Sequence, residues 1–201
     1  MSPQTTERKG GLVLGKGVPA SIDQGPLHDG ADVSWIPRCN VGENQGESAA
    51  CAMFAVANWA EIMFRKNYSS AEMLALYRAN AVMGGLSVPS AFRAAQTVGW
   101  VQGRSVCMST QSLDLLDTQP IIAAYAITEA WDNVDTVSGC LDHNPKLTAE
   151  RGLHAVLIVA KKDGAIVQFE NSWGTEWGYH GLGQMEYALH LRLCRGLWVL
   201  L

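Results

Sequence analysis

The feature that most constrains the fold is an uncharged, apolar stretch early in the chain. No charged residue occurs from Ser48 to Ala60, and helix formers with apolar side chains dominate from Cys51 onward. Such residues occupy nearly every position around a helical wheel, and a helix of this kind is buried on most of its sides. We therefore expect a central helix over about 50–66, with Ser48 as its N-terminal cap.

Cys51 falls in the first turn of this predicted helix, where the helix dipole lowers the pKa of a thiol and favours the thiolate. Gln45, six residues earlier, is placed to direct an amide N–H toward the same point. A thiolate beside a neutral donor indicates covalent catalysis on a carbonyl group. A free cysteine is also commonly just a small buried hydrophobe, so this stretch alone leaves both interpretations open.

Length and composition indicate a globular chain. The 201 residues fit one domain or two lobes that share a cleft, and 48% apolar with 17% charged residues describe ample core. The net charge of −4 gives no reason to expect nucleic acid, and no apolar run approaches the roughly 18 residues of a membrane span. Leu12–Leu14 is too short for the core of a signal peptide. We expect a cytoplasmic protein, or one released by a non-classical route.

The cysteines do not indicate a metal site. They lie far apart, without a C-x-x-C pair, whereas a zinc site needs clustered ligands. Apart from Cys51, four remain, which allow three disulfide pairings or none, so the redox compartment stays open. The five are Cys39, Cys51, Cys107, Cys140 and Cys194.

The hydrophobic period changes along the chain. A flexible tail (1–17) and an extended arm (18–43) precede helices predicted over about 50–66, 71–81 and 89–97. Strands are predicted over 121–127, 153–160, 165–170, 182–187 and 196–201. This order predicts an α+β protein with a helical lobe over about 44–110 and an antiparallel β lobe over about 111–201, to which the arm over 18–43 also belongs.

A predicted hairpin places two polar side chains together. If Lys161–Gly164 form a four-residue loop, His154 lies opposite Asn171, and a two-residue loop sets His154 opposite Trp173. Both registers leave His154 and Asn171 on the same face, and only a one-residue slip separates them. An Asn beside a His can fix the ring tautomer, although a lone His in an apolar strand is more often a core residue.

The segment after Asn171 carries two tryptophans among glycines. Trp173 and Trp177 lie four residues apart in Ser172–Gly178. This segment is either a loop anchored by core indoles or an aromatic lid that shields a His–Asn hydrogen bond from water.

Three separated blocks carry a family resemblance. Asn-Gln-Gly-x4-Cys over 44–51, His-Ala-Val over 154–156 and Asn-Ser-Trp-Gly-x2-Trp-Gly over 171–178, in that order, resemble the papain-like cysteine peptidases. Residues 19–23 look like the start of the family's mature domain, and 119–120 like the entry to its second lobe. By position, the resemblance implies Cys51 as nucleophile, His154 as base and acid, Asn171 as orienter and Gln45 as oxyanion donor.

The resemblance also implies a fold and a substrate site. We expect a papain-like fold of two lobes, one helical and one resembling a β-barrel, with the active site in the cleft between them. Gly84 and Gly85 would hold the substrate backbone in an extended pose, and Trp173 would cover the histidine. The pocket for the side chain two residues before the scissile bond would be lined by Leu86, Ala124 and Ala155, which favours medium or large apolar side chains.

The chain departs from the family near the nucleophile. Ala52 stands where the family usually has Trp, Ser48 where it has Cys, and Ala49 and Ala50 where it has Gly-Ser. These changes affect the shape of the groove and leave the four chemical groups in place. A late cysteine placed as in the family suggests a disulfide between Cys140 and Cys194.

The implied activity is that of a cysteine endopeptidase acting on polypeptides through a thioester at Cys51, without metal or organic cofactor. Two alternatives use the same fold: an amidase or an acyl or isopeptide transferase, and a non-catalytic peptide-binding module. Only about 18 residues precede the block at 19–23, too few for an independently folded inhibitory segment. We expect a protein that is competent as synthesised, restrained by compartment, by timing or by a separate inhibitor or regulator, whether or not residues 8–11 are trimmed.

Overall fold

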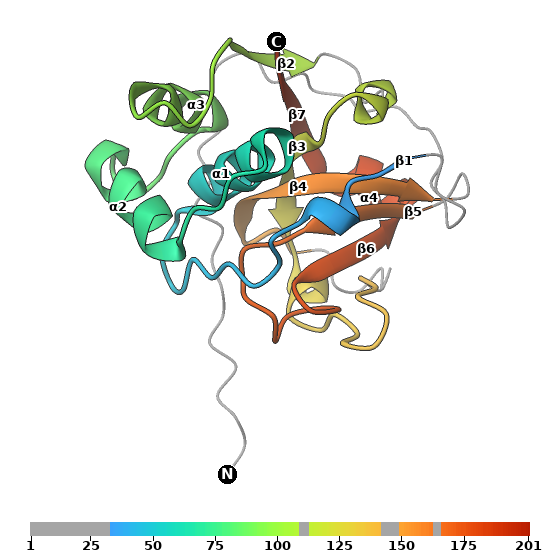
Figure 1. Ribbon diagram of the computed structural model, residues 1–201. Helices are drawn as coiled ribbons and strands as arrows, with labels where there is room; N and C mark the ends of the chain where they lie inside the picture. The colour runs from blue at the N-terminus through green and yellow to red at the C-terminus, as the bar shows by residue number, and fades with distance from the viewer. Residues whose placement is uncertain (1–32, 109–112, 142–148, 163–165) are drawn as a thin grey trace.

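The computed structural model describes residues 33–108, 113–141, 149–162 and 166–201 (Figure 1). The predicted tail and residues 18–32 of the arm lie outside the described residues. In chain order the elements are β1 (Val33–Ser34), η1 (Ile36–Arg38), α1 (Cys51–Phe64), α2 (Ser70–Asn80), α3 (Val88–Thr97), β2 (Ser105–Met108), η2 (Asp114–Asp117), β3 (Ile121–Ile127), η3 (Glu129–Trp131), β4 (Gly152–Lys162), β5 (Ile166–Glu170), β6 (Leu182–Glu186), α4 (Tyr187–Leu193) and β7 (Cys194–Leu200). Helices come first and strands later, which confirms the predicted α+β class.

The strands form one antiparallel sheet. Its order is β2-β7-β3-β4-β5-β6, and β1 pairs with β4. Strands β2 and β6 end this path without pairing with each other in the described part of the chain. The sheet is therefore open there, and the predicted barrel-like closure is not seen.

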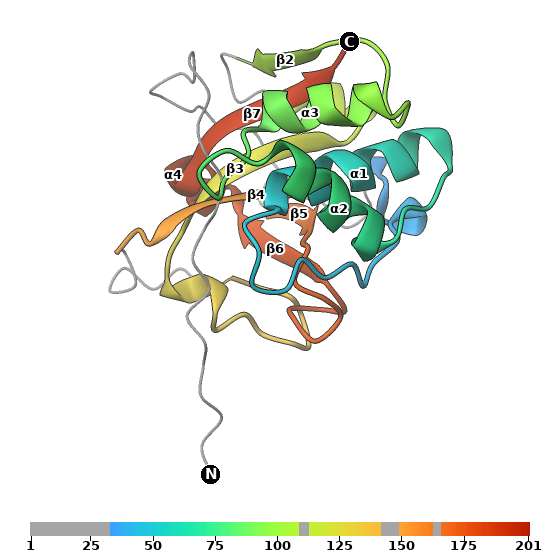
Figure 2. The same cartoon turned by 90° about the vertical axis from the view of Figure 1, so that its left-hand side faces the viewer.

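Helix α1 lies between the sheet and the helices α2 and α3 (Figures 1 and 2). Every residue from Cys51 to Ile62 is buried, as the apolar wheel predicts. The predicted cap is wrong, because Ala50 is the N-cap and the Ser48 hydroxyl instead donates to Gln45 O at 2.6 Å. The loop before α1 thus folds on itself and leaves the helix start to its backbone.

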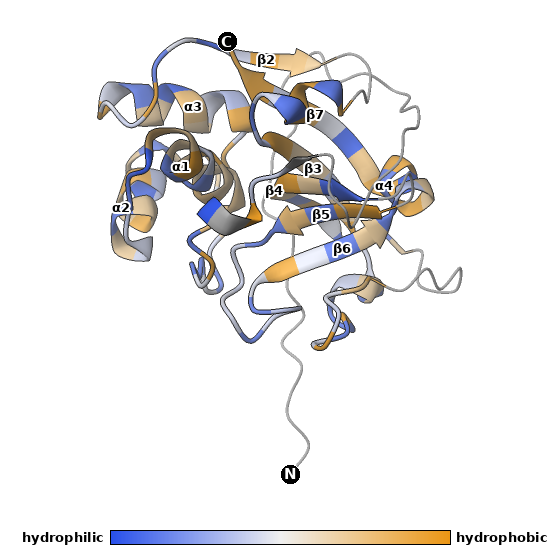
Figure 3. Cartoon of the chain, turned by 45° about the vertical axis from the view of Figure 1, so that its right-hand side comes forward, coloured by the Kyte–Doolittle hydropathy of each residue, from blue (hydrophilic) through white to orange (hydrophobic). Residues whose placement is uncertain are grey.

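Strand β4 separates two apolar cores because its side chains alternate between the faces of the sheet. Ala155, Leu157 and Val159 face the core that contains α1. Val156 and Ile158 face the second core, which is built from the sheet and α4. Figure 3 shows hydrophobic colouring along β4 and a mixture of both colours on the outer helix α2.

A buried glutamine joins the helical half to the sheet. Gln119 Nε2 donates to Leu200 O at 2.9 Å, and Leu200 N donates to Gln119 Oε1 at 3.1 Å. The indole of Trp59, on α1, also donates to Gln119 Oε1 at 3.2 Å. One amide side chain therefore links α1, the start of β3 and the end of β7.

A β-bulge sets the register at the predicted site. Near the hairpin, Lys162 pairs with Ile166, and that register continued would put His154 and Asn171 on opposite faces of the sheet. The register shifts between Ile158 and Ala160, so Leu157 pairs with Glu170. This shift restores the register predicted for a two-residue loop, although the Asp163-Gly164 turn lies outside the described residues.

No disulfide joins Cys140 to Cys194, so that prediction is wrong. Cys194 is a free cysteine at the start of β7, and its thiol lies 3.5 Å from Gly196 O. Its burial raises the thiol pKa to about 12, which keeps it protonated. Cys140 lies instead beside Gln184, with which it forms an isolated parallel bridge.

None of the helices in the described ranges combines the length and the apolarity needed to cross a membrane.

Candidate active site

His154 and Asn171 form a buried hydrogen bond. His154 Nε2 lies 2.7 Å from Asn171 Oδ1, and the two residues are 1% and 2% exposed. The histidine comes from β4 and the asparagine follows β5 directly. The structure thus brings together the two residues that the hairpin placed on one face.

The neighbouring backbone fixes which ring nitrogen carries the proton. Ser172 N donates to the same Asn171 Oδ1 at 2.8 Å, so that atom is the amide oxygen and accepts both bonds. His154 Nε2 must then be the donor, and Nδ1 carries the lone pair of the neutral ring. A ring in this tautomer can take up a proton at Nδ1 without losing its bond to Asn171.

Two distant loops pair beside this hydrogen bond. Gln45 N donates to Ser172 O at 2.9 Å, and Gly174 N donates to Glu43 O at 3.0 Å. Gly174 has φ +80°, and a Cβ there would lie 2.9 Å from Asn44 Nδ2, so only glycine allows this close approach. The loop before Cys51 and the loop after Asn171 are therefore held together through their backbones.

The side chain of Gln45 is fixed by two contacts. Its Oε1 accepts from the Ser172 hydroxyl at 2.6 Å, and its Nε2 donates to Ser48 O at 2.6 Å. The prediction that the amide N–H points toward the same place as Cys51 is corrected in part, because one Nε2 hydrogen binds Ser48 O in its own loop. The second Nε2 hydrogen is the one left for another acceptor.

Cys51 is the first residue of α1 and is fully buried. At this position the backbone N–H cannot have an intrahelical partner, and the helix dipole is positive. Its side chain lies in the same core as Ala155, the neighbour of His154. The fold therefore places the candidate nucleophile at the end of α1 that meets β4.

Three tryptophans surround the histidine. Trp173 lies against His154 with ring centroids 4.6 Å apart, and Trp177 meets Trp173 edge to face at 5.5 Å. The third, Trp131, contacts His154 at 5.9 Å, also edge to face, and was not identified from the sequence. It lies in the loop after β3, far from every motif, so no local pattern distinguishes it.

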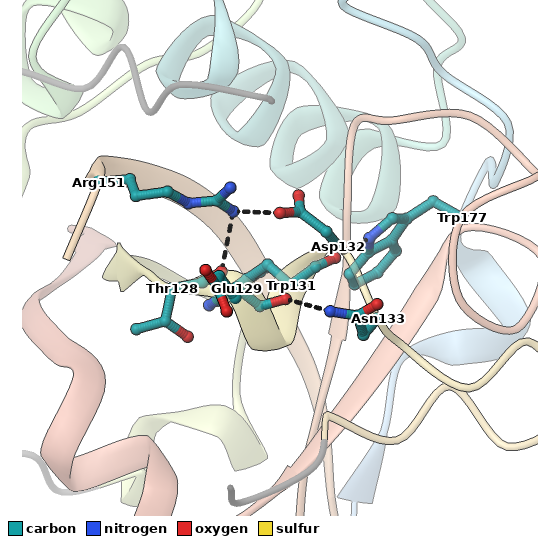
Figure 4. A network of polar contacts seen from close by, with 7 residues as sticks. All are labelled: Thr128, Glu129, Trp131, Asp132, Asn133, Arg151 and Trp177. Carbon is teal, nitrogen blue, oxygen red and sulfur yellow. Dashed lines mark hydrogen bonds and ion pairs between the residues drawn. The ribbon is translucent and has the colours of Figure 1, made fainter. Parts of the chain in front are cut away.

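A polar network holds the segment that carries Trp131 (Figure 4). Arg151 Nη2 pairs with Asp132 Oδ2 at 2.5 Å and donates to Thr128 O at 3.0 Å. The Trp177 indole donates to Trp131 O at 2.8 Å. These contacts connect η3 to the start of β4 and to the loop after Asn171, which fixes the aromatic wall around His154.

Ser172 is a second residue that sequence reasoning missed. It binds Asn171 through its backbone N–H and Gln45 through its hydroxyl. Its position between Asn171 and Trp173 was noted only as loop sequence. Its place in the sequence could have indicated this role, because a hydroxyl next to the buried amide of Asn171 needs a hydrogen-bond partner of its own.

The predicted substrate-binding residues fall into two groups. Ala124 and Ala155 pair directly across β3 and β4, and Leu86 packs in the same core. Gly84 and Gly85 lie in a tight turn, in which Gly85 N donates to Val82 O at 3.1 Å and Val82 N donates to Gly85 O at 3.0 Å. Gly85 thus uses its own N–H within the turn.

Comparisons with solved structures agree with this architecture. The chain is similar to xylellain, a cysteine protease from Xylella fastidiosa, with a TM-score of 0.64 and 16% identity over 94% of this chain and 98% of that one. It is equally similar in fold to the digestive procathepsin L2 proteinase of Tenebrio molitor larval midgut, with a TM-score of 0.64 and 18% identity over 96% of this chain and 78% of that one. No protein-family model matches the chain, and neither does any curated protein. The chain therefore has the fold of the papain-like cysteine peptidases.

Proposed function

We propose that the protein is a cysteine endopeptidase that hydrolyses peptide bonds through a thioester at Cys51. The observation that carries the proposal is the buried His154–Asn171 hydrogen bond on a papain-like fold. Support comes from the pairing of the loop before Cys51 with the loop after Asn171. Further support comes from the two solved structures described above, a cysteine protease and a digestive proteinase.

In this mechanism Cys51 and His154 act as a pair in the cleft between the helical lobe and the sheet. The thiol of Cys51 gives its proton to Nδ1 of His154, and the thiolate attacks the peptide carbonyl. Asn171 keeps accepting from Nε2, so the imidazolium stays oriented. His154 then returns the proton to the leaving amine, and water hydrolyses the thioester with His154 as general base.

The oxyanion of the tetrahedral intermediate requires preorganised donors. We assign this role to the second Nε2 hydrogen of Gln45 and to the backbone N–H of Cys51. The Ser172 hydroxyl supports this assignment, because it binds Gln45 Oε1 and so determines which end of the amide is the donor. A donor fixed before substrate arrives needs no reorganisation during the reaction.

The substrate is a polypeptide bound as an extended strand beside Gly84 and Gly85. Because Gly85 N–H already bonds within its turn, the strand pairs with Gly85 O, which accepts a second hydrogen bond. The preceding apolar side chain of the substrate then approaches Leu86, Ala124 and Ala155. Trp173 covers the His154–Asn171 bond on the other side of the scissile peptide.

A peptide-library digest tests the proposal. The wild-type protein is expected to cleave internal peptide bonds, and Cys51→Ala is expected to leave the library intact. Cys107→Ala is the matched control, since this thiol lies on β2 and not on α1, and it is expected to cleave normally. A wild type that spares peptides but turns over small amides or transfers acyl groups would indicate an amidase or transferase instead.

A further inference from the structure

Two glutamates are buried, and the charge of Glu61 acts on Glu170. Glu61, on α1, is 3% exposed, and Glu170, the last residue of β5, is 2% exposed. Glu170 directly precedes Asn171. A buried carboxyl group therefore adjoins the residue that binds His154.

The hydrogen bonds around this pair leave acceptors without donors. Tyr68 N donates to Glu61 Oε1 at 2.5 Å. Glu61 Oε2, both carboxylate oxygens of Glu170 and Asn58 Oδ1 are buried and have no hydrogen-bond partner among the described residues. Three of these four atoms are carboxyl oxygens, and a buried carboxylate without a hydrogen-bond partner is costly when it is charged.

No positive charge compensates the pair in the described part of the chain. The ion pairs there join Arg151 to Asp132 and Arg195 to Glu150, and neither reaches Glu61 or Glu170. Nor is any group of three or more His, Cys, Asp or Glu arranged there to hold a metal ion. A proton is the remaining way to supply a donor.

Burial favours that proton. Desolvation raises the pKa of Glu170 to about 8, although the Cys39 thiol beside it lowers this pKa by more than the charge of Glu61 raises it, and Asn58 lowers it further. Desolvation and the charge of Glu43 raise the pKa of Glu61 to about 7. The Cys39 thiol facing Glu170 stays protonated, since burial raises its pKa, and Tyr68 is also held neutral by burial and by Glu61.

We propose that Glu170 acts as a neutral acid, and that its proton keeps Asn171 in position for His154. Glu170 is thus a positioning residue, and its effect on turnover rests on the proposed peptidase function. When Glu170 ionises, an unpaired charge is buried at the end of β5 and destabilises it. Asn171 is affected first, because β5 ends at Glu170 and Asn171 N holds its place through one bond to Gly181 O at 2.9 Å.

The direction of the pH effect follows from the raised pKa values. In the unfolded chain both glutamates ionise near pH 4.5, whereas in the folded protein they keep protons up to about pH 7 and 8. Between these limits the folded state binds more protons than the unfolded state, so stability falls as pH rises. This contribution is complete below pH 4.5 and is lost by about pH 8.

Glu170→Gln keeps the shape of the neutral acid and removes its titration. We expect this variant, and Glu61→Gln as a second one, to lose less stability in urea unfolding between pH 5 and 9 than the wild type. The exposed Glu176→Gln is the matched control and is expected to lose as much as the wild type. A Glu170→Gln protein that is less stable than the wild type at pH 9 would overturn the proposal, because Glu170 would then be a charged partner of a cation.

Turnover supplies the second measurement. The ratio of kcat/KM in Glu170→Gln to that in the wild type is expected to rise about tenfold between pH 7 and 9, as the wild type loses its proton. A flat ratio with the expected unfolding result would leave Glu170 as a neutral acid and refute its positioning role. If no variant cleaves peptides at any pH, the proposed function fails while the unfolding result still tests the pair.

Discussion

Two histidines are buried in the described part of the chain, and they are bonded in opposite ways. His154 donates from Nε2 to the amide oxygen of Asn171 at 2.7 Å. His190, on α4, lies 2.6 Å from the Tyr125 hydroxyl through Nδ1 and stacks on Tyr187. A phenol donates to a neutral ring nitrogen, so protonation of His190 would remove its bond, whereas protonation of His154 at Nδ1 leaves its bond intact.

This difference separates a candidate base from a core histidine. Burial lowers the pKa of His190 to about 3, and the ring stays neutral at ordinary pH. Its Nε2 is buried without a hydrogen-bond partner in the described residues. Both rings are therefore buried. The ring whose partner is an acceptor can take up a second proton, whereas the ring whose partner is a donor cannot do so without losing its hydrogen bond.

The largest effect is expected from removal of the catalytic pair. His154→Ala and Cys51→Ala should each lower kcat/KM at least about a thousandfold, since groups that act as a unit fail together. His190→Ala should lower stability and keep activity in whatever fraction remains folded. Peptide hydrolysis normalised to folded protein checks this, and equal losses at the two histidines would contradict the distinction.

Removal of the acceptor should have a smaller effect. Asn171→Ala leaves Cys51 and His154 in place but frees the ring to rotate, so we expect a loss of about 10- to 100-fold in kcat/KM with measurable turnover. Trp131→Phe is the companion variant, which keeps an aromatic edge near His154 and should lose less. Complete inactivity of Asn171→Ala would show that the asparagine does more than orient.

His190 should control stability in acid. Its folded pKa of about 3 lies below the usual 6.5, so the unfolded chain takes up a proton first and stability falls as pH drops from about 6.5 toward 3. His190→Gln should reduce this loss. At neutral pH it should lower the free energy of unfolding by about 1 kcal/mol, because the hydrogen bond with Tyr125 is altered. The exposed His180→Gln is the control. Measured by urea unfolding, its free energy of unfolding should fall between pH 7 and pH 4 by as much as that of the wild type. If both variants lost the same free energy of unfolding between pH 7 and pH 4, the assignment of this loss to His190 would be contradicted.

The smallest effect concerns substrate preference. Contacts with Leu86, Ala124 and Ala155 should favour medium or large apolar side chains two residues before the scissile bond. Each buried CH₂ contributes roughly 0.8 kcal/mol, so selectivity should be graded, at about fourfold per methylene. A library that favours Arg or Glu at this position would contradict the pocket.

The sequence predicted best the elements that are apolar on all sides. The strand at 121–127 coincides with β3 and the central helix with α1, because both are apolar on all sides. Helix α4 was missed, since Leu189, Leu191 and Leu193 repeat with a period of two that is typical of a strand.

Other features depend on tertiary structure and carry no local signal. The bulge at Val159 is one, and its carbonyl binds Trp35 N at 2.7 Å, which ties the arm to the strand at the point where the register shifts. The wall formed by Trp131 is another, because Arg151 and Asp132 place it from outside any motif. Both become visible only when the sheet is assembled.

The most direct test of the central claim is site-resolved alkylation of the native protein. Iodoacetamide at pH 6, with peptide mapping, should modify Cys51 far faster than Cys194 and Cys39, whose thiol pKa values are raised by burial. His154→Ala should abolish the fast reaction, and His190→Gln should leave it unchanged. Slow labelling of Cys51, or fast labelling that persists without His154, would contradict the account of a Cys51–His154 catalytic pair.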